Sequence, residues 1–365
     1  MSAAPKRKSR PRAATLADVG RVAGVSAMAA SAVLNGARTS SRISELTKGR
    51  ILAAAAKLNY RPNGAARALA NRRMNTIGVA ALFAGTEINQ YFLEVFNGIV
   101  EAAASHRQTT TVFTLRSWKE EADRIPSFCD GRIDGLILVA PVLARETGES
   151  LPKHVPFVAL HANTPMPNVI NLESDEETGA YEVVRHLTTL GHRRIMHLSG
   201  PPDVVGGQRR IRGYRRALRD AGIKPDDTLT IETDFHQDSA RQALRQWLRR
   251  HKGQPLPQAI FCVNDNAAIG CIEMLAEAGL RVPDDVSVVG FDDTLAARTT
   301  IPQLTTVRQP LREMGHRAVE ILLEEIVNRH SPSDMPPPPI IFPTSIVHRA
   351  SVGKPSVPLQ IVPAV

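Results

Sequence analysis

From Thr76 onward, short apolar segments alternate with amphipathic ones. The apolar segments have the length of strands, and they read TIGVAALF, TTTVFTL, GLILVA, FVALH, RIMHLSG, TIETDF, AIFCVND and VSVVGFDD. Between them, residues 91–105, 211–221 and 267–278 have the spacing of amphipathic helices. Alternating strands and helices predict parallel sheets that helices cover on both faces. At this length, two such sheets with a cleft at their strand ends are favoured over one very wide sheet.

The first 75 residues differ from the rest in charge. They hold 15 lysines and arginines but only Asp18 and Glu45 as acidic residues, a net charge of +13, whereas the remaining residues carry a net charge of −4. A basic small domain beside a near-neutral body indicates a polyanionic partner, because neutralising phosphates releases condensed counterions. Nucleic acid is the partner we expect, although a membrane surface would attract the same charge.

Helix signals within this basic segment predict a helix-turn-helix. Thr15 and Asp18 have the spacing of a capping box, so a helix is expected to follow and to end at about Ala23. Gly24 then allows a tight turn, and Ser26 is positioned to cap a second helix that ends near residue 34. Two short helices joined at a glycine are typical of this motif.

A third helix is expected at about residues 45–58. Its apolar residues come near the spacing of one buried stripe, and they are Leu46, Ile51, Leu52, Ala55 and Leu58. Pro62 and Asn63 interrupt the chain after it. The small-residue segment 64–70 is too short to form a stable isolated helix.

Several protein classes are disfavoured by what the sequence lacks. Residues 1–14 are basic without an apolar core, and no stretch approaches 18 uninterrupted apolar residues, so we expect neither secretion nor a membrane span but a cytoplasmic protein. The three cysteines have no metal-binding spacing and are expected to be buried, reduced thiols: Cys129, Cys262 and Cys271. There is no nucleophile elbow, HExxH or Walker loop, so we expect no enzyme, cofactor or metal.

The motifs and their order closely resemble the lactose-repressor (LacI/GalR) family of bacterial transcription regulators. The resemblance covers about residues 15–351 and rests on TLADVGRVAGVS, VLN, NYRPNGAARAL, DGLIL, HLTTLGHRRIMHLSGPP, RIRGYRRAL, VND, and GFDDT followed by PQLTTV. It implies an α/β protein with a three-helix helix-turn-helix head and a two-lobed effector domain like the type I periplasmic binding proteins. It also implies a sequence-specific homodimeric repressor that binds a pseudo-palindromic DNA operator and a small polar effector, for which a sugar or sugar derivative is the expected class. By the same resemblance, the expected location is the bacterial cytoplasm, in association with the nucleoid.

The resemblance also implies domain boundaries. We expect a disordered basic tail at 1–14, the head at 15–60, a hinge helix and linker at 61–75, the ligand-binding and dimerisation domain at 76–352, and a tail at 353–365. Within the large domain, the expected N-lobe comprises about 76–172 and 303–335. The expected C-lobe comprises about 173–302 and 336–352.

DNA contacts of the head are expected at the start of the second helix. There Ala27 and Met28 can offer base edges only apolar contact, such as contact with a thymine methyl group. The family usually shows Thr-Val-Ser-Arg where this chain has Ala-Ala-Ser-Ala at 29–32, so direct readout is expected to be modest. The alternative is that these alanines are only good helix formers and the head docks through phosphates. The remaining expected contacts of the head are Thr15, Leu16, Ser26, Ser31, Asn35 and Tyr60.

The hinge is expected to carry much of the specificity. By resemblance, Leu69 enters a central base step from the minor groove and kinks the duplex, with Asn63 and Ala66 lying along that groove. An apolar wedge unstacks bases at a cost of a few kcal/mol, which extra contacts on bent DNA offset. The alternative is that Leu69 packs against its own core.

Effector contacts are expected around the cleft. Carried over by motif, they are Arg210 in R-x-x-G-Y, Asn264 in VND and Asp292 in GFDD, a set that suits a hydroxyl-rich ligand. Tyr91 or Phe92 is expected to supply an apolar face. His161 stands where lactose-type members carry Asp, and its alternative role is structural. Asp292 could instead pair with a surface arginine.

Two further functions remain open at this stage. A plain solute-binding protein shares the body but needs a signal peptide and no helix-turn-helix, the reverse of this sequence. A corepressor-dependent, activating or architectural regulator would share every motif. The position of the operator relative to a promoter would separate an activating or architectural regulator from a repressor.

Overall fold

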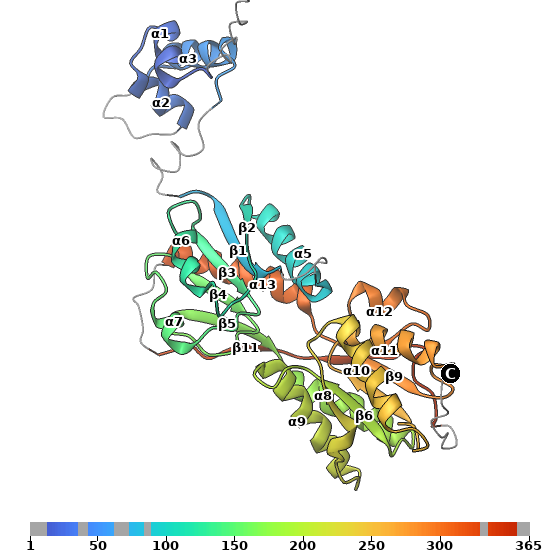
Figure 1. Cartoon of the computed structure of the whole chain (residues 1–365). Coiled ribbons are helices and arrows are strands. Elements are labelled where there is room, and N and C mark those ends of the chain that lie inside the picture. The colour runs from blue at the N-terminus through green and yellow to red at the C-terminus, as the bar shows by residue number, and fades with distance from the viewer. Residues whose placement is uncertain (1–12, 36–42, 62–72, 84–88, 329–334, 356–365) are drawn as a thin grey trace, which may run out of the picture. The chain divides into compact units, whose positions relative to one another are not determined.

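The computed structural model describes residues 13–35, 43–61, 73–83, 89–328 and 335–355. The chain divides into two compact units, Met1–Asn75 and Thr76–Val365 (Figure 1). Residues 1–12 of the expected tail at 1–14, residues 356–365 of the expected tail at 353–365, and residues 62–72 of the expected hinge lie outside the described residues.

Three helices form the head: α1 (Leu16–Ala23), α2 (Ala27–Asn35) and α3 (Glu45–Lys57). The predicted capping box is confirmed, because the Asp18 N–H donates to Oγ1 of Thr15 at 3.3 Å and the Thr15 N–H donates to the Asp18 carboxylate at 3.0 Å. Gly24 ends α1 in the left-handed region with φ 68°, which a side chain would oppose. The helix-turn-helix therefore forms where local signals predict it.

The core of the head is small and made mostly of short side chains. Its fully buried members are Val19, Ala23, Ala30, Ile51, Ala54 and Ala55. The predicted stripe on α3 is wrong in part, since Leu46 and Leu52 are 79% and 54% exposed. At about 100° per residue, Leu46 falls on the far side of the helix from Ile51, where no described residue of the head covers it.

The larger unit contains two six-stranded sheets. The first has the order β11-β5-β4-β3-β1-β2 and is parallel throughout. Its strands are β1 (Thr76–Leu82), β2 (Thr109–Leu115), β3 (Gly135–Val139), β4 (Phe157–Leu160), β5 (Val169–Ser174) and β11 (Ile340–Phe342). The second has the order β12-β10-β9-β8-β6-β7, and only its edge strand β12 is antiparallel. Its strands are β6 (Ile195–Ser199), β7 (Thr230–Glu232), β8 (Ala259–Cys262), β9 (Ser287–Asp292), β10 (Thr305–Arg308) and β12 (Ser345–Val347).

Helices cover both faces of each sheet, as predicted (Figure 1). The first sheet packs against α5 (Gln90–Ser105) and α13 (Leu311–Asn328) on one face. Its other face packs against α6 (Ile125–Phe128) and against Leu143 and Leu151, which flank the short α7 (Arg145–Glu149). The second sheet packs between the pair α8 (Glu176–Thr189) and α9 (Val205–Asp220) and the pair α10 (Gln237–Arg250) and α11 (Asp265–Glu277). The short α12 (Leu295–Thr299) and the 3-10 turns η1 (Ala122–Arg124) and η2 (Asp227–Leu229) complete the described elements.

The chain crosses between the sheets three times, after β5, β10 and β11. These crossings correct the expected lobe boundaries. Strand β10 was expected in the N-lobe segment 303–335, but Thr305 pairs with Val289 in the second sheet. Strand β11 was expected in the C-lobe segment 336–352, but Ile340 pairs with Leu172 in the first. Sequence alternation indicates which segments are strands, but it does not indicate which sheet each one joins.

The three cysteines, Cys129, Cys262 and Cys271, are buried free thiols, as predicted.

Among the described helices, no single one is long and apolar enough to cross a membrane. The bent pair α1 and α2, at 106°, reaches the required length and composition only in combination. Within that pair, Val19, Ala23 and Ala30 are buried in the core of the head, whereas Val22 and Met28 are exposed.

Candidate functional site

A cavity of about 430 Å³ lies between the two sheets of the larger unit, at the carboxyl ends of their strands. Ligands of open α/β sheets bind at this position. All six residues that the sequence assigns to the effector line its walls: Tyr91, Phe92, His161, Arg210, Asn264 and Asp292. Their location was predicted correctly, whereas their contact with a ligand stays a prediction.

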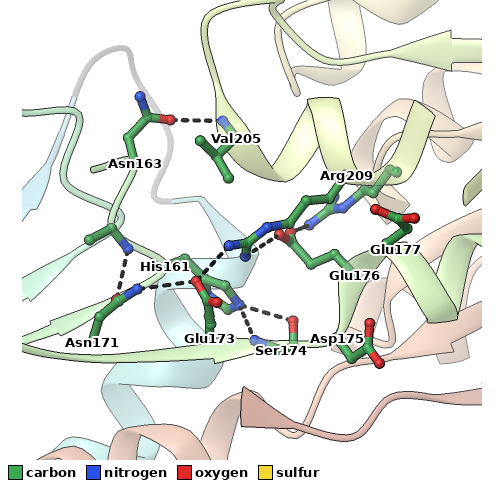
Figure 2. Close-up of polar contacts among 12 residues, drawn as sticks. His161, Asn163, Asn171, Glu173, Ser174, Asp175, Glu176, Glu177, Val205 and Arg209 are labelled. Atoms are coloured by element: carbon green, nitrogen blue, oxygen red, sulfur yellow. Dashed lines mark hydrogen bonds and ion pairs between the residues drawn. The ribbon is translucent and has the colours of Figure 1, made fainter. Parts of the chain in front are cut away.

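His161 anchors the wall on the side of the first sheet. Its Nδ1 lies 2.6 Å from the Tyr91 hydroxyl oxygen. Its Nε2 accepts a hydrogen bond of 3.1 Å from the backbone N–H of Ser174 (Figure 2). Burial lowers the pKa of His161 to about 4, so the ring is neutral at pH 7. Burial also raises the pKa of Tyr91, which therefore remains a phenol.

Hydrogen bonds continue from this ring to the opposite wall. The Ser174 hydroxyl donates to the side-chain oxygen of Gln309, and the Gln309 amide nitrogen donates to Asp292 at 2.6 Å. Asp292 ends β9 with φ 118°, and burial raises its pKa. A chain of polar contacts thus links Tyr91 to Asp292 through the points where the polypeptide crosses between the sheets.

Arg210 is occupied by protein partners. Its Nη2 donates to Glu176 at 2.7 Å, its Nη1 donates to the Val263 carbonyl, and its guanidinium lies 4.1 Å from the centroid of the Phe291 ring. Its Nε has no hydrogen-bond partner among the described residues. The nearest Asp292 oxygen lies 3.9 Å from Nη2 of Arg210. The Asp292 carboxylate therefore has a buried arginine beside it, rather than the surface arginine considered from the sequence.

Asn264 also has a local role. Its Oδ1 accepts the Ala267 N–H at 2.9 Å and caps α11, while its Nδ2 donates to the Phe235 carbonyl at 3.0 Å. These bonds fix the amide at the rim of the cavity. A ligand that used Asn264 would share these atoms with the backbone.

Contacts from one sheet to the other close the cavity. Asn163, which follows β4, accepts the Val205 N–H through Oδ1 at 2.7 Å, so it caps α9 from the opposite lobe (Figure 2). Arg209 on α9 forms an ion pair of 2.9 Å with Glu173 on β5. Two outer contacts join Lys119 to Asp203 at 2.9 Å and the Ala296 N–H to Gln90 at 3.2 Å. The structure is therefore that of a closed cleft.

Sequence reasoning missed several residues of the cavity walls. They are Trp118, Asn163, Glu176, Arg209, Phe235 and Asn266, among others. Phe235 could have been found, because it ends the quoted segment TIETDF, and Arg209 directly precedes the predicted Arg210. Trp118 and Asn163 follow strands in irregular loops, where neither periodicity nor a motif marks a side chain as facing the cleft.

The walls combine aromatic faces with paired charges. Tyr91, Phe92, Trp118 and Phe235 supply aromatic surface. Glu176 on the wall pairs with Arg209 and Arg210, and Arg209 also pairs with Glu173 of β5. Within the described part of the chain, no group of three or more metal-ligating side chains is present. Such a site is suited to binding a small polar molecule.

On the head, the first turn of α2 is open to solvent. Ala27 and Met28 are exposed, Met28 by 73%. Ser26 accepts the Ala29 N–H at 3.1 Å, and Asn35 donates to Ser31 at 3.1 Å.

The other expected contacts of the head have structural partners as well. The Thr15 hydroxyl donates to Asp18 at 2.7 Å, and Leu16 and Tyr60 pack against the core of the head. The hinge predictions Asn63, Ala66 and Leu69 lie outside the described residues. The first turn of α2 therefore exposes apolar side chains, whereas its contact with DNA stays a prediction.

Comparison with known proteins agrees with this architecture. Residues 15–63 match the family of bacterial regulatory proteins, lacI family, and residues 184–352 match the periplasmic binding protein-like domain. The HTH-type transcriptional repressor PurR of Vibrio atlanticus is 34% identical over 321 residues, which cover 87% of this chain and 93% of the relative. The chain belongs to the LacI family.

Solved structures of LacI-family proteins share the fold over almost the whole chain. The lac repressor dimer bound to operator and the anti-inducer ONPF matches with a TM-score of 0.78 and 29% identity, covering 93% of this chain and 99% of that one. A complex of the transcriptional regulator CelR with cellobiose matches with a TM-score of 0.64 and 30% identity, covering 94% and 100%. Family membership makes this protein a transcriptional regulator with a DNA-binding helix-turn-helix head and a periplasmic-binding-protein-like body. These relatives are regulators rather than enzymes.

Proposed function

We propose that this protein is a sequence-specific repressor whose affinity for its operator is controlled by a small polar effector bound between the two lobes. The observation that carries this proposal is the cavity, whose walls come from both sheets. Contacts such as the hydrogen bond from the Val205 N–H to Asn163 join the two lobes across it. A ligand that contacts both walls stabilises one relative arrangement of the lobes over others, which is the requirement for an allosteric effector.

A sugar or sugar derivative is the effector class that we propose first. Aromatic side chains beside carboxylates suit the apolar faces and hydroxyl groups of such a ligand. The CelR complex contains cellobiose, which supports this class. Nucleobases form the second class to test, because aromatic walls also suit flat rings.

DNA recognition is assigned to the head and the hinge. The exposed Ala27 and Met28 lack groups for bidentate hydrogen bonds to bases. We therefore assign much of the affinity to phosphate contacts and much of the specificity to the hinge. The proposed wedge is Leu69, with Asn63 and Ala66 along the minor groove. We keep the proposed divisions at 15–60 for the head and 61–75 for the hinge and linker.

Two copies of the chain are expected to act together. A pseudo-palindromic operator mirrors the two-fold symmetry of a dimer, and the lac repressor of similar fold is a dimer on its operator. Effector binding would change how the two bodies hold the paired hinges. Such coupling is typically about 1 to 3 kcal/mol, and it must be reciprocal between effector and DNA.

The test joins a ligand screen to a DNA assay. Thermal shifts with sugars, sugar acids and nucleobases identify a ligand, and duplexes selected from random sequence provide an operator. The DNA affinity is then measured over a range of salt concentrations with and without the ligand. The proposal predicts that a ligand which raises the melting temperature also changes operator affinity at fixed salt.

A further inference from the structure

His161 has a different kind of neighbour at each ring nitrogen. The backbone N–H of Ser174 points at Nε2 over 3.1 Å, and a backbone amide can only donate. Nε2 is therefore the acceptor nitrogen. In a neutral imidazole, the single proton then lies on Nδ1.

The proton on Nδ1 faces Tyr91. The Tyr91 hydroxyl oxygen lies 2.6 Å from Nδ1, so this oxygen accepts the hydrogen bond and its own hydrogen must point to another acceptor. Tyr91 lines the cavity. The ring of His161 thus directs the phenolic hydrogen toward the space in which a ligand would lie.

Neighbouring groups hold the imidazole in this form. The Ser174 hydroxyl also lies 3.0 Å from Nε2, but its hydrogen is directed to the Gln309 oxygen. Gln309 cannot turn its amide without losing the bond from its nitrogen to Asp292. The charged groups that act on the ring are Glu176, Arg209 and Arg210, whose effects oppose one another, so burial keeps the ring neutral.

We infer that His161 is a positioning residue which makes the Tyr91 hydroxyl a hydrogen-bond donor into the cavity, and that the effector carries an acceptor atom against it. Such an acceptor is a carbonyl, ether, hydroxyl or ring-nitrogen atom. An ammonium group at this point is disfavoured, although Glu176 and Asp292 also line the cavity and would otherwise attract it. The ligand class rests on the proposed effector function, whereas the state of the ring does not.

The first test reads the ring directly in the full chain without ligand. Nitrogen NMR of histidine-labelled protein, with the His161 signals assigned by their loss in His161→Gln, reports which nitrogen carries the proton. We expect a protonated Nδ1 and an unprotonated Nε2, unchanged between pH 5.5 and pH 8. A proton on Nε2, or a doubly protonated ring within this range, would overturn the inference.

The second test uses two replacements of similar shape and opposite polarity. His161→Asn retains a donor that can reach Tyr91, whereas His161→Asp offers only acceptors and turns the Tyr91 hydrogen away from the cavity. The probe is whichever of D-ribose, cellobiose, D-gluconate, adenine and guanine gives the largest thermal shift. We expect His161→Asp to bind this probe roughly tenfold more weakly than His161→Asn, and Tyr91→Phe to lose roughly three- to tenfold relative to the wild type.

The outcomes of the two tests separate the inference from the proposed function. Equal affinities of the Asn and Asp variants, with both proteins folded by circular dichroism, would overturn the donor role of Tyr91. If no probe binds, the proposed effector classes fail, while the NMR result still decides the role of His161.

Discussion

The side-chain oxygen of Asn163 accepts a hydrogen bond of 2.7 Å from the backbone N–H of Val205, the first residue of α9. Val204, at the N-cap position of that helix, has no side-chain bond to offer it. A residue of the first lobe therefore caps a helix of the second. Opening the cleft would leave this helix end without its cap.

Replacing Asn163 tests this link. Asn163→Ala should lower the free energy of unfolding of the body by about 1 kcal/mol, the usual cost of a lost N-cap, and should weaken ligand-induced stabilisation. Asn163→Asp keeps an acceptor at a favourable helix end and should retain most of the stability. Urea unfolding followed by circular dichroism measures both. Equal losses in the two variants would show that the cap contributes nothing.

The buried pair of Arg210 and Glu176 should be costly to break from one side. Glu176→Gln removes the nearer carboxylate of the guanidinium and leaves only the Asp292 oxygen at 3.9 Å, so we expect a loss of about 3 kcal/mol in the free energy of unfolding. The double variant Arg210→Met with Glu176→Gln should lose less than the sum of the single variants. Lys119→Ala, which removes an exposed ion pair, serves as the control and should cost less than about 1 kcal/mol. Additive losses in the double-mutant cycle would contradict direct coupling.

His197 makes the stability of the body dependent on pH. It is fully buried between the rings of Tyr214 and Phe261, and burial lowers its pKa to about 4 from the ordinary 6.5. Between these values the unfolded chain binds a proton that the folded chain does not, so the contribution of this residue to stability falls as the pH drops from about 6.5 to 4.

A replacement isolates this contribution. From pH 7 to pH 5, the wild type should lose roughly 2 kcal/mol more than His197→Leu. The measurement is urea unfolding at each pH. Parallel slopes for the wild type and His197→Leu would rule out the buried neutral ring.

The hinge carries a separate prediction for DNA binding. Leu69→Ala should weaken specific binding to the operator much more than binding to unrelated duplex, because the wedge acts only where the DNA can be kinked. Fluorescence anisotropy with both duplexes at one salt concentration measures the ratio. Equal losses of affinity for the two duplexes would show that Leu69 does not act as a wedge.

Much of the fold could be predicted because its signals are local. The Thr15 and Asp18 capping box and the turn at Gly24 depend on neighbours within a few residues, and both form as predicted. The sheet to which β10 belongs depends on Thr305 pairing with Val289, and sequence periodicity carries no information about that choice. The burial of Leu46 failed as a prediction because it requires a partner surface that the head does not supply.

The candidate site shows the same limit. Motifs located Arg210, Asn264 and Asp292 around one cavity, but the bonds that occupy Arg210 and Asn264 involve Glu176 and the Phe235 carbonyl, which are distant in sequence. A motif indicates where a side chain lies. It does not indicate whether the polar atoms of that side chain are available to a ligand.

The most direct test of effector control is a linkage measurement with one ligand and one operator duplex. The ligand that gives the largest thermal shift is titrated into the protein with and without saturating operator, and the operator is titrated with and without saturating ligand. The account predicts that each changes the affinity of the other by the same factor, roughly 5- to 150-fold. A ligand that binds in the cavity and raises the melting temperature, yet leaves operator affinity unchanged, would contradict it.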